Sequence, residues 1–138
     1  MTFEDIVRKW VCVPSRVALV GASPREDRPV SGIQTYLQSR GFAVYPVNPA
    51  YRGASLGGVP CLGGLEDLPG PVDLVVLFLS PEKQAEALHQ VRRLSPTPVV
   101  WFQPGAENPL GAENLRREGV EVVEDCILAT HKRLCGKA

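Results

Sequence analysis

The chain lacks any long hydrophobic run. Its longest apolar stretch, residues 74–79, has the length of a buried strand, whereas a membrane-spanning helix needs about 20 apolar residues. The first residues also lack an apolar segment, since acidic Glu4 and Asp5 stand near the start. We therefore expect no signal peptide and no membrane association, and we expect a cytoplasmic location.

The chain also lacks an excess of either charge. Its 15 basic residues balance its 15 acidic residues, so the formal net charge is +0. A balanced chain has no overall field that would attract DNA, RNA or an anionic membrane surface. We therefore expect no nucleic-acid partner, and any affinity for an anion must be local.

Closely spaced cysteines are missing as well. The four cysteines (Cys12, Cys61, Cys126 and Cys135) are far apart and form no CxxC pair, which argues against a structural zinc site. In a cytoplasmic protein we expect all four to be reduced.

The remaining composition is that of an ordinary globular protein, with 44% hydrophobic and 22% charged residues. A chain of 138 residues is expected to form a single domain over residues 1–138. It has one methionine and 13 prolines, and eleven of its 15 basic residues are arginine. This mixture is typical of thermophilic proteins and equally of a GC-rich genome.

Apolar runs of strand length alternate with helical patterns along the chain. We expect strands at residues 17–20, 42–47, 72–79, 98–102 and 120–123, and a short one at 58–61. Helices are expected at residues 3–11, at about 80–94, from Asn108 to Gly119, and at 125–134; a further helix that follows the first strand has Ile33, Tyr36 and Leu37 on its buried face and ends at Gly41. Such alternation predicts an α/β fold of the Rossmann-like doubly wound type, with a mainly five-stranded parallel sheet and helices on both faces.

Small or amide residues stand beside proline after four of these strands, in Gly21-Ala-Ser-Pro, Val47-Asn-Pro, Leu79-Ser-Pro and Phe102-Gln-Pro-Gly. Ligands of doubly wound sheets bind outside the carboxyl ends of the strands. Proline fixes φ, and a stiff loop loses less entropy when a ligand binds. Prolines also simply end strands, but four such loops at one sheet edge favour a ligand cleft.

The first of these loops carries the most information. The apolar residues 17–20 stop at Gly21, small residues follow, and Arg25 and Arg28 come just beyond. A strand, a tight turn and a helix start place backbone N–H groups and a helix N-terminus together, which favours a phosphate. The arginines add charged donors, so we interpret the turn as a nucleotide or pyrophosphate site.

The familiar nucleotide motifs are absent. The turn keeps the first glycine of GxGxxG and loses the other two, and Asn48 stands where an acid would bind a ribose. These departures disfavour NAD(P), and nothing matches the P-loop pattern GxxxxGK[ST].

Several segments, taken in order, are similar to the family of CoA-binding domains. They are Val17-Ala-Leu-Val-Gly-Ala-Ser-Pro, Arg28-Pro29, Gly41-Phe-Ala-Val-Tyr-Pro-Val-Asn-Pro, Gly58-Val-Pro, Leu65-Glu-Asp-Leu-Pro, Pro71-Val-Asp-Leu-Val and Val99-Val-Trp-Phe-Gln-Pro-Gly. The tail with Asp125-Cys126, His131 and Arg133-Leu134 also fits. This module occurs alone in small bacterial proteins, and at one end of the succinyl-CoA synthetase α subunit and of ADP-forming acyl-CoA synthetases.

The resemblance implies a site for coenzyme A or acyl-CoA. Gly21, Ala22, Ser23 and Pro24 would lie under the pyrophosphate, with Arg25 or Arg28 countering its charge. Asn48 and Pro49 would flank the adenosine and its 3′-phosphate, Leu79, Ser80 and Pro81 would line the nucleotide side, and Gln103 and Gly105 would lie near the pantetheine arm. In one departure, apolar Phe78-Leu79 follows the third long strand, where many relatives carry basic or polar residues.

No residue pattern indicates a catalytic centre. We expect His89 to lie on a helix surface and His131 to make a structural hydrogen bond, and no serine has a base beside it in a recognisable pattern. Cys61 or Cys126 would be candidates for a mixed disulfide with CoA, although an inert buried cysteine is the simpler interpretation. We therefore expect a CoA-binding accessory or regulatory protein and no enzyme. An NAD(P)-binding oxidoreductase-type domain and an interaction subunit of a split acyl-CoA synthetase remain as alternatives, and a protein partner or homo-oligomer stays open.

Overall fold

The computed structural model describes residues 1–136, and its centre is a five-stranded parallel sheet in the order β2-β1-β5-β6-β7. The strands are β1 (Arg16–Val20), β2 (Ala43–Val47), β5 (Leu74–Leu77), β6 (Val99–Phe102) and β7 (Val122–Glu124). A small antiparallel pair, β3 (Ser55–Leu56) and β4 (Val59–Pro60), lies in the long segment after β2. The predicted α/β fold class is confirmed.

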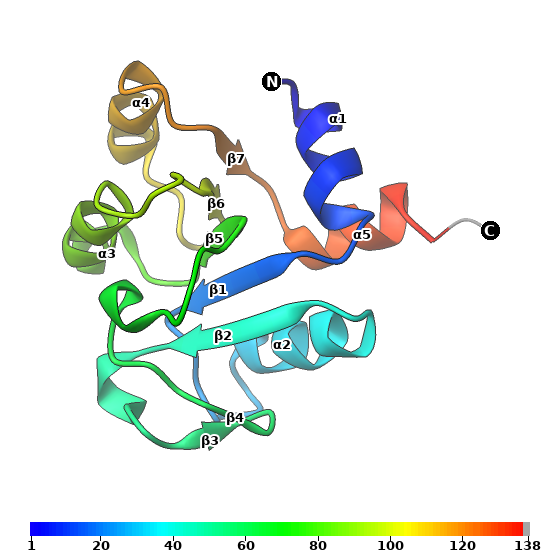
Figure 1. The fold of residues 1–138 in the computed structure, drawn as a ribbon, viewed down its shortest axis with the longest axis vertical. Helices are drawn as coiled ribbons and strands as arrows, with labels where there is room; N and C mark the ends of the chain where they lie inside the picture. Colours follow the sequence, from blue (N-terminus) through cyan, green and yellow to red (C-terminus); the bar gives the residue numbers. More distant parts are fainter. Residues whose placement is uncertain (137–138) are drawn as a thin grey trace.

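Helices cover both faces of the sheet (Figure 1). One face carries α2 (Pro29–Ser39), α5 (Ile127–Leu134), and α1 (Phe3–Ile6), which continues as the π-helical turn η1 (Val7–Val11). The opposite face carries α3 (Ala85–Val91) and α4 (Pro109–Arg117). Short 3-10 turns are η2 (Pro49–Tyr51), η3 (Leu65–Asp67) and η4 (Pro81–Lys83).

The strands are buried on both faces, as a parallel sheet between two helical layers requires. In β1, Val17 and Leu19 belong to the core under α1, α2 and α5, whereas Ala18 and Val20 belong to the core under α3 and α4. In β6, likewise, Trp101 belongs to the core under α1, α2 and α5, and Phe102 belongs to the core under α3 and α4. The continuous apolar runs in the sequence reflect this two-sided burial.

The helix expected at about residues 80–94 differs from the structure. The segment 80–94 is broken into η4 and the short helix α3, because the fully buried Gln84 lies at the junction and bonds to the neighbouring loops. Ser80 makes no side-chain cap there. In agreement with the expected strand at 42–47, pairing includes Pro46 and reaches Val47, which is possible because β2 is an edge strand of this sheet.

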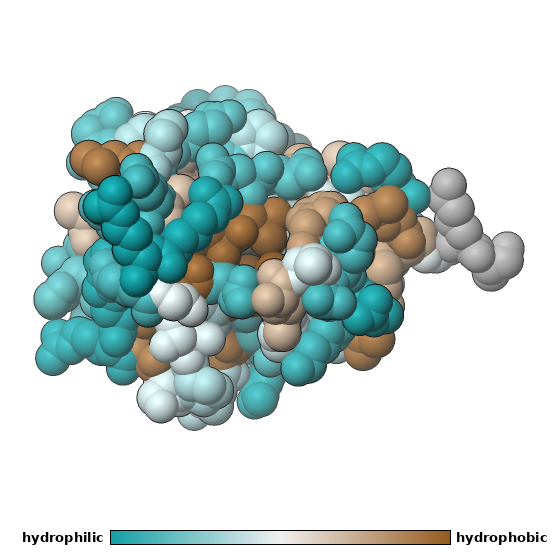
Figure 2. All heavy atoms as spheres, turned by 90° about the horizontal axis from the view of Figure 1, so that it is seen from above, coloured by the Kyte–Doolittle hydropathy of each residue, from teal (hydrophilic) through white to brown (hydrophobic). Residues whose placement is uncertain are grey.

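Polar residues cover most of the face seen in Figure 2, and apolar residues are visible in the middle of that face and in smaller groups toward its edges. Among residues 1–136, no helix combines the length and the hydrophobicity that a membrane crossing demands.

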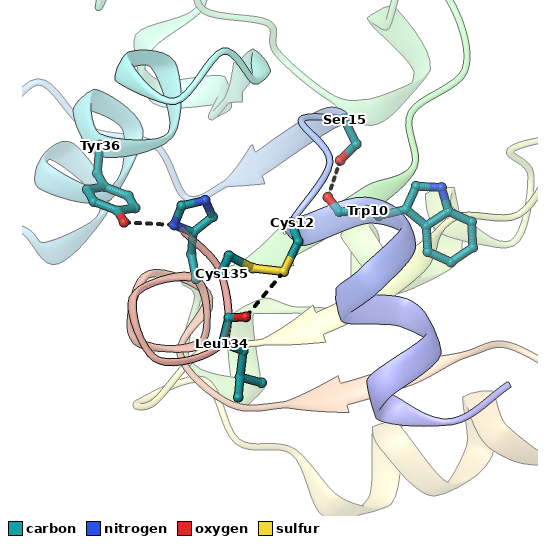
Figure 3. Close-up of a disulfide and its surroundings, with 7 residues drawn as sticks. Trp10, Cys12, Ser15, Tyr36, Leu134 and Cys135 are labelled. Carbon is teal, nitrogen blue, oxygen red and sulfur yellow. Dashed lines mark hydrogen bonds between the residues drawn. A yellow bond between two sulfur atoms is a disulfide. The ribbon is translucent and has the colours of Figure 1, made fainter. Parts of the chain in front are cut away.

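The expectation that all four cysteines are reduced is wrong for two of them. Cys12 follows η1 and Cys135 follows α5, and the two form a disulfide with a Cα–Cα distance of 5.1 Å (Figure 3). The cause is that η1 and α5 pack side by side on one sheet face, which brings together cysteines that are 123 residues apart. The bond links the two ends of the chain.

Reducing this disulfide should destabilise the protein, because a crosslink that closes so long a loop restricts the unfolded chain. We expect a loss of about 2–5 kcal/mol in the free energy of unfolding, measured by urea unfolding with and without dithiothreitol. The double variant Cys12→Ser/Cys135→Ser should match the reduced protein and no longer respond to dithiothreitol. An equal urea midpoint for the oxidised and reduced protein would contradict the stabilising role.

Candidate functional site

The main cleft lies where the winding of the sheet reverses. After β1 the chain leaves toward α2 on one face, and after the neighbouring β5 it leaves toward α3 on the other. Loops that diverge in this way leave a crevice at the carboxyl ends of the strands. Here the crevice is a cavity of about 390 Å³ lined by Gly21, Ser23, Arg25, Arg28, Asn48, Tyr51, Phe78, Leu79, Ser80, Lys83 and Gly105.

The floor of this cleft depends on a glycine. Gly21 has a φ of +94°, and a Cβ atom built on it would lie 3.1 Å from Leu79 Cδ2 and 3.3 Å from Phe78 Cβ. The loops after β1 and β5 therefore touch at the base of the crevice, and a side chain here would meet both backbone strain and crowding.

The cleft is basic although the whole chain carries no net charge. Arg25, Arg28 and Lys83 line it, and its lining contains no acidic residue. The Arg25 guanidinium is engaged by Asp27, at 2.9 and 3.2 Å. Arg28 and Lys83 form no ion pair within residues 1–136. Their charge is available to an anion in the cleft.

The backbone donors expected in the first turn are largely occupied. The N–H groups of Gly21 and Ala22 both donate to the Val47 carbonyl, at 2.9 and 3.2 Å, and the N–H of Arg25 donates to Ser23 Oγ. The interpretation of this turn as a set of free phosphate-binding amides is therefore wrong for Gly21 and Ala22. The groups that remain suited to an anion are the basic side chains and the N-terminus of α2, which begins directly after Arg28.

Asn48 lines the cleft but uses both ends of its side-chain amide within the protein. Its Nδ2 donates to the Ala22 carbonyl at 2.8 Å, and its Oδ1 accepts from the Ala50 N–H at 2.9 Å. Asn48 therefore fixes the loop after β2 against the loop after β1.

A second cavity of about 280 Å³ adjoins the first and shares Gly21, Arg28, Phe78 and Gly105 with it. Its other lining residues are Pro29, Val30, Ile33, Gln103, Pro104 and Cys126. Arg28 is the one charged residue in this lining. The cleft thus has a basic part and a mainly apolar part.

Nine of the predicted site residues line one or both cavities: Gly21, Ser23, Arg25, Arg28, Asn48, Leu79, Ser80, Gln103 and Gly105. The other four do not. Ala22 is fully buried beside Leu56 and Cys61, and Pro24 borders a separate small pocket near α2. Pro49 and Pro81 begin the 3-10 turns η2 and η4, of which the last residues, Tyr51 and Lys83, line the first cavity.

Sequence reasoning missed a buried residue that organises the cleft. Gln84 is 0% exposed, and its Nε2 donates to the carbonyls of Leu79 and Ala106 at 2.8 and 2.7 Å, while its Oε1 accepts from Asn108. It ties the loop after β5 to the loop after β6. Lys83, which lines the first cavity, was also not predicted as a site residue. Its place directly after Ser80-Pro81, one of the predicted strand-end loops, could have indicated it.

The two histidines lie where the sequence predicted. His89 is exposed on α3, and His131 Nδ1 lies 2.8 Å from the hydroxyl of Tyr36, with the ring of Phe42 beside it. Burial, and secondarily the charge of Arg40, lower the pKa of His131. Neither histidine lines the cleft, and no cluster of three or more metal-ligating side chains is found in residues 1–136.

Comparison with known proteins assigns a family to this arrangement. A family model described as a CoA binding domain matches residues 15–132, which include every strand of the sheet. The chain belongs to this family.

Three relatives show that similar domains occur both as small separate proteins and as part of a larger ligase. An uncharacterised protein of Bacillus subtilis, YneT, is 32% identical over 84% of both chains. An ADP-forming acetate–CoA ligase of Archaeoglobus fulgidus is 32% identical over 80% of this chain, which corresponds to 16% of the ligase. A solved structure from Thermus thermophilus has a TM-score of 0.88 and 32% identity, covering 97% of this chain and 99% of that one.

Replacing Gly21 should destabilise this CoA binding domain. Gly21→Ala places a side chain at positive φ against Leu79, and we expect a loss of about 1–3 kcal/mol in the free energy of unfolding, measured by urea unfolding. Gly32 in α2 is the matched control, because no atom lies within 4 Å of its added Cβ. Gly32→Ala should stabilise the protein by about 0.5–1 kcal/mol. An unchanged midpoint for Gly21→Ala would show that the two loops do not approach closely.

His131 should make stability depend on pH. Its folded-state pKa lies below the ordinary 6.5, so the unfolded chain takes up the proton first as the pH falls. The contribution of neutral His131 to the free energy of unfolding is therefore complete above pH 6.5, and it is lost as the pH falls through the folded-state pKa. Urea midpoints from about pH 8 to pH 5 should therefore fall for the native protein and for His89→Gln, and less steeply for His131→Phe. Equal slopes for all three would contradict this role.

Proposed function

We propose that this chain binds coenzyme A or an acyl-CoA non-covalently in the cleft, as an accessory or regulatory protein without a complete catalytic site of its own. The observation that carries the proposal is the two-part cleft at the winding reversal. Its basic part has three cationic side chains and no acid, and it opens into a mainly apolar part. CoA has the matching chemistry, with phosphates at one end and a pantetheine arm at the other.

Membership of the CoA binding domain family supports the same ligand. The phosphates would lie against Arg28, Lys83 and the N-terminus of α2, where charge-assisted hydrogen bonds and the helix dipole act together. The pantetheine arm would enter the second cavity beside Ile33 and Phe78. Gln84 and Asn48 would hold the loops in place before the ligand arrives, which reduces the entropy lost on binding.

The proposal includes a cytoplasmic location in a thermophilic cell. A structural disulfide such as Cys12–Cys135 is rare in the cytosol of mesophiles but common in the intracellular proteins of hyperthermophiles. The high arginine and proline content agrees with this setting.

The match to part of an acetate–CoA ligase supports a second candidate function, an interaction subunit of a split acyl-CoA synthetase. Isothermal titration with CoA, dephospho-CoA, NAD and ATP separates the candidates. Binding of CoA supports our proposal, binding of NAD without CoA favours the oxidoreductase-type alternative, and binding of none of the four favours the interaction subunit.

The Arg28 side chain should contribute directly to CoA affinity. It lines both parts of the cleft and forms no ion pair within the described residues. Arg28→Ala should weaken CoA binding by about 1–3 kcal/mol, the size of a charge-assisted hydrogen bond, in the same titration. The control is Arg93→Ala, which removes the same charge from an exposed position outside both cavities and should leave the affinity unchanged. Equal affinity for Arg28→Ala and the native protein would remove Arg28 from the site.

A further inference from the structure

The far wall of the apolar cavity contains a thiol. Cys126 lines this cavity together with Val30 and Ile33 of α2 and with Gln103 at the end of β6. It is a free cysteine and only partly buried. Because the two cavities share Gly21, Arg28, Phe78 and Gly105, an elongated ligand whose charged end occupies the basic part can extend toward Cys126.

The sulfur of Cys126 is held in a defined polar environment. Gln103 is 3% exposed; its Oε1 accepts from the Ile127 N–H at 2.8 Å, and its Nε2 donates to Cys126 Sγ at 3.6 Å. Cys126 is also the N-cap residue of α5, and its side chain makes no capping hydrogen bond. A buried amide donor therefore contacts the sulfur, at the residue that directly precedes the first turn of α5.

Resting on the proposed function, we propose that Cys126 is a site of reversible thiol–disulfide exchange with CoA bound in the cleft. The co-reactant is the symmetrical disulfide of CoA. The Cys126 thiol loses its proton to solvent and the thiolate attacks the near sulfur of this disulfide. A bond forms between Sγ and that sulfur, the sulfur–sulfur bond of the CoA disulfide breaks, and the second CoA leaves as a thiolate with the electron pair. No further oxidant is required.

The other cysteines are excluded by their surroundings. Cys12 and Cys135 are bonded to each other. Cys61 is 2% exposed, lines neither cavity, and lies with its sulfur 3.6 Å from the carbonyl oxygens of Asn48 and Leu62. Burial raises the pKa of the Cys61 thiol, which keeps it protonated and unreactive. The exchange should therefore modify one residue.

The test compares two disulfides on the native protein with its Cys12–Cys135 bond intact. CoA disulfide and glutathione disulfide are added at equal concentration, and adducts are followed by intact mass and located by peptide mapping. We expect one CoA adduct, on Cys126, removed by dithiothreitol and formed about tenfold or more faster than the glutathione adduct, because binding raises the local concentration. Arg28→Ala should slow the CoA reaction, whereas Arg93→Ala, which changes an exposed residue outside both cavities, should leave the rates with both disulfides unchanged.

The outcomes separate this proposal from the proposed function. If titration detects CoA binding but no CoA adduct forms on Cys126, the exchange proposal is overturned and the binding function stands. Equal rates for the two disulfides, or a CoA adduct on Cys61, would overturn it in the same way. If CoA does not bind, both proposals fail. The adduct should be absent from Cys126→Ser, and an adduct that persists there would contradict the assignment.

Discussion

The winding reversal between β1 and β5 is the constraint on which the rest of the structure depends. Two adjacent parallel strands send their following helices, α2 and α3, to opposite faces of the sheet. The loops must separate above the sheet, while at its edge they approach so closely that Gly21 meets Leu79. A crevice follows from this topology, and the absence of a side chain at Gly21 allows the two loops to close its floor.

The loops that line the crevice are held in place by polar side chains whose hydrogen bonds are made mainly within the protein. Asn48, Gln84 and Gln103 each bond to a neighbouring loop or helix start. Asn48 joins the loops after β1 and β2, Gln84 joins the loops after β5 and β6, and Gln103 joins the end of β6 to the start of α5. Breaking these bonds would leave polar groups without partners, which costs free energy. The amide side chains therefore fix the positions of the loops, whereas the exposed side chains of Arg28 and Lys83 give the cleft its positive charge.

The sequence allowed the sheet to be predicted because its strands are buried on both faces and appear as continuous apolar runs. It also located most of the cleft, since small residues and prolines mark the strand ends. It did not reveal which polar atoms are already used. The N–H groups of Gly21 and Ala22 donate hydrogen bonds to the Val47 carbonyl, which belongs to a segment far away in the chain. Gln84 looked like an ordinary helix residue, and the Cys12–Cys135 pairing depends on helix packing that spacing alone does not encode.

Helix α5 connects the cleft to the ends of the chain. Gln103 fixes its first residue, Ile127, beside the apolar cavity, whereas the Tyr36–His131 contact and the Cys12–Cys135 disulfide fix its far end. A short helix restrained at both ends cannot tilt freely, so the position of Cys126 at its start depends on packing at the opposite end. The Cys12–Cys135 disulfide therefore restrains the end of α5 that lies opposite Cys126, the residue that lines the apolar cavity.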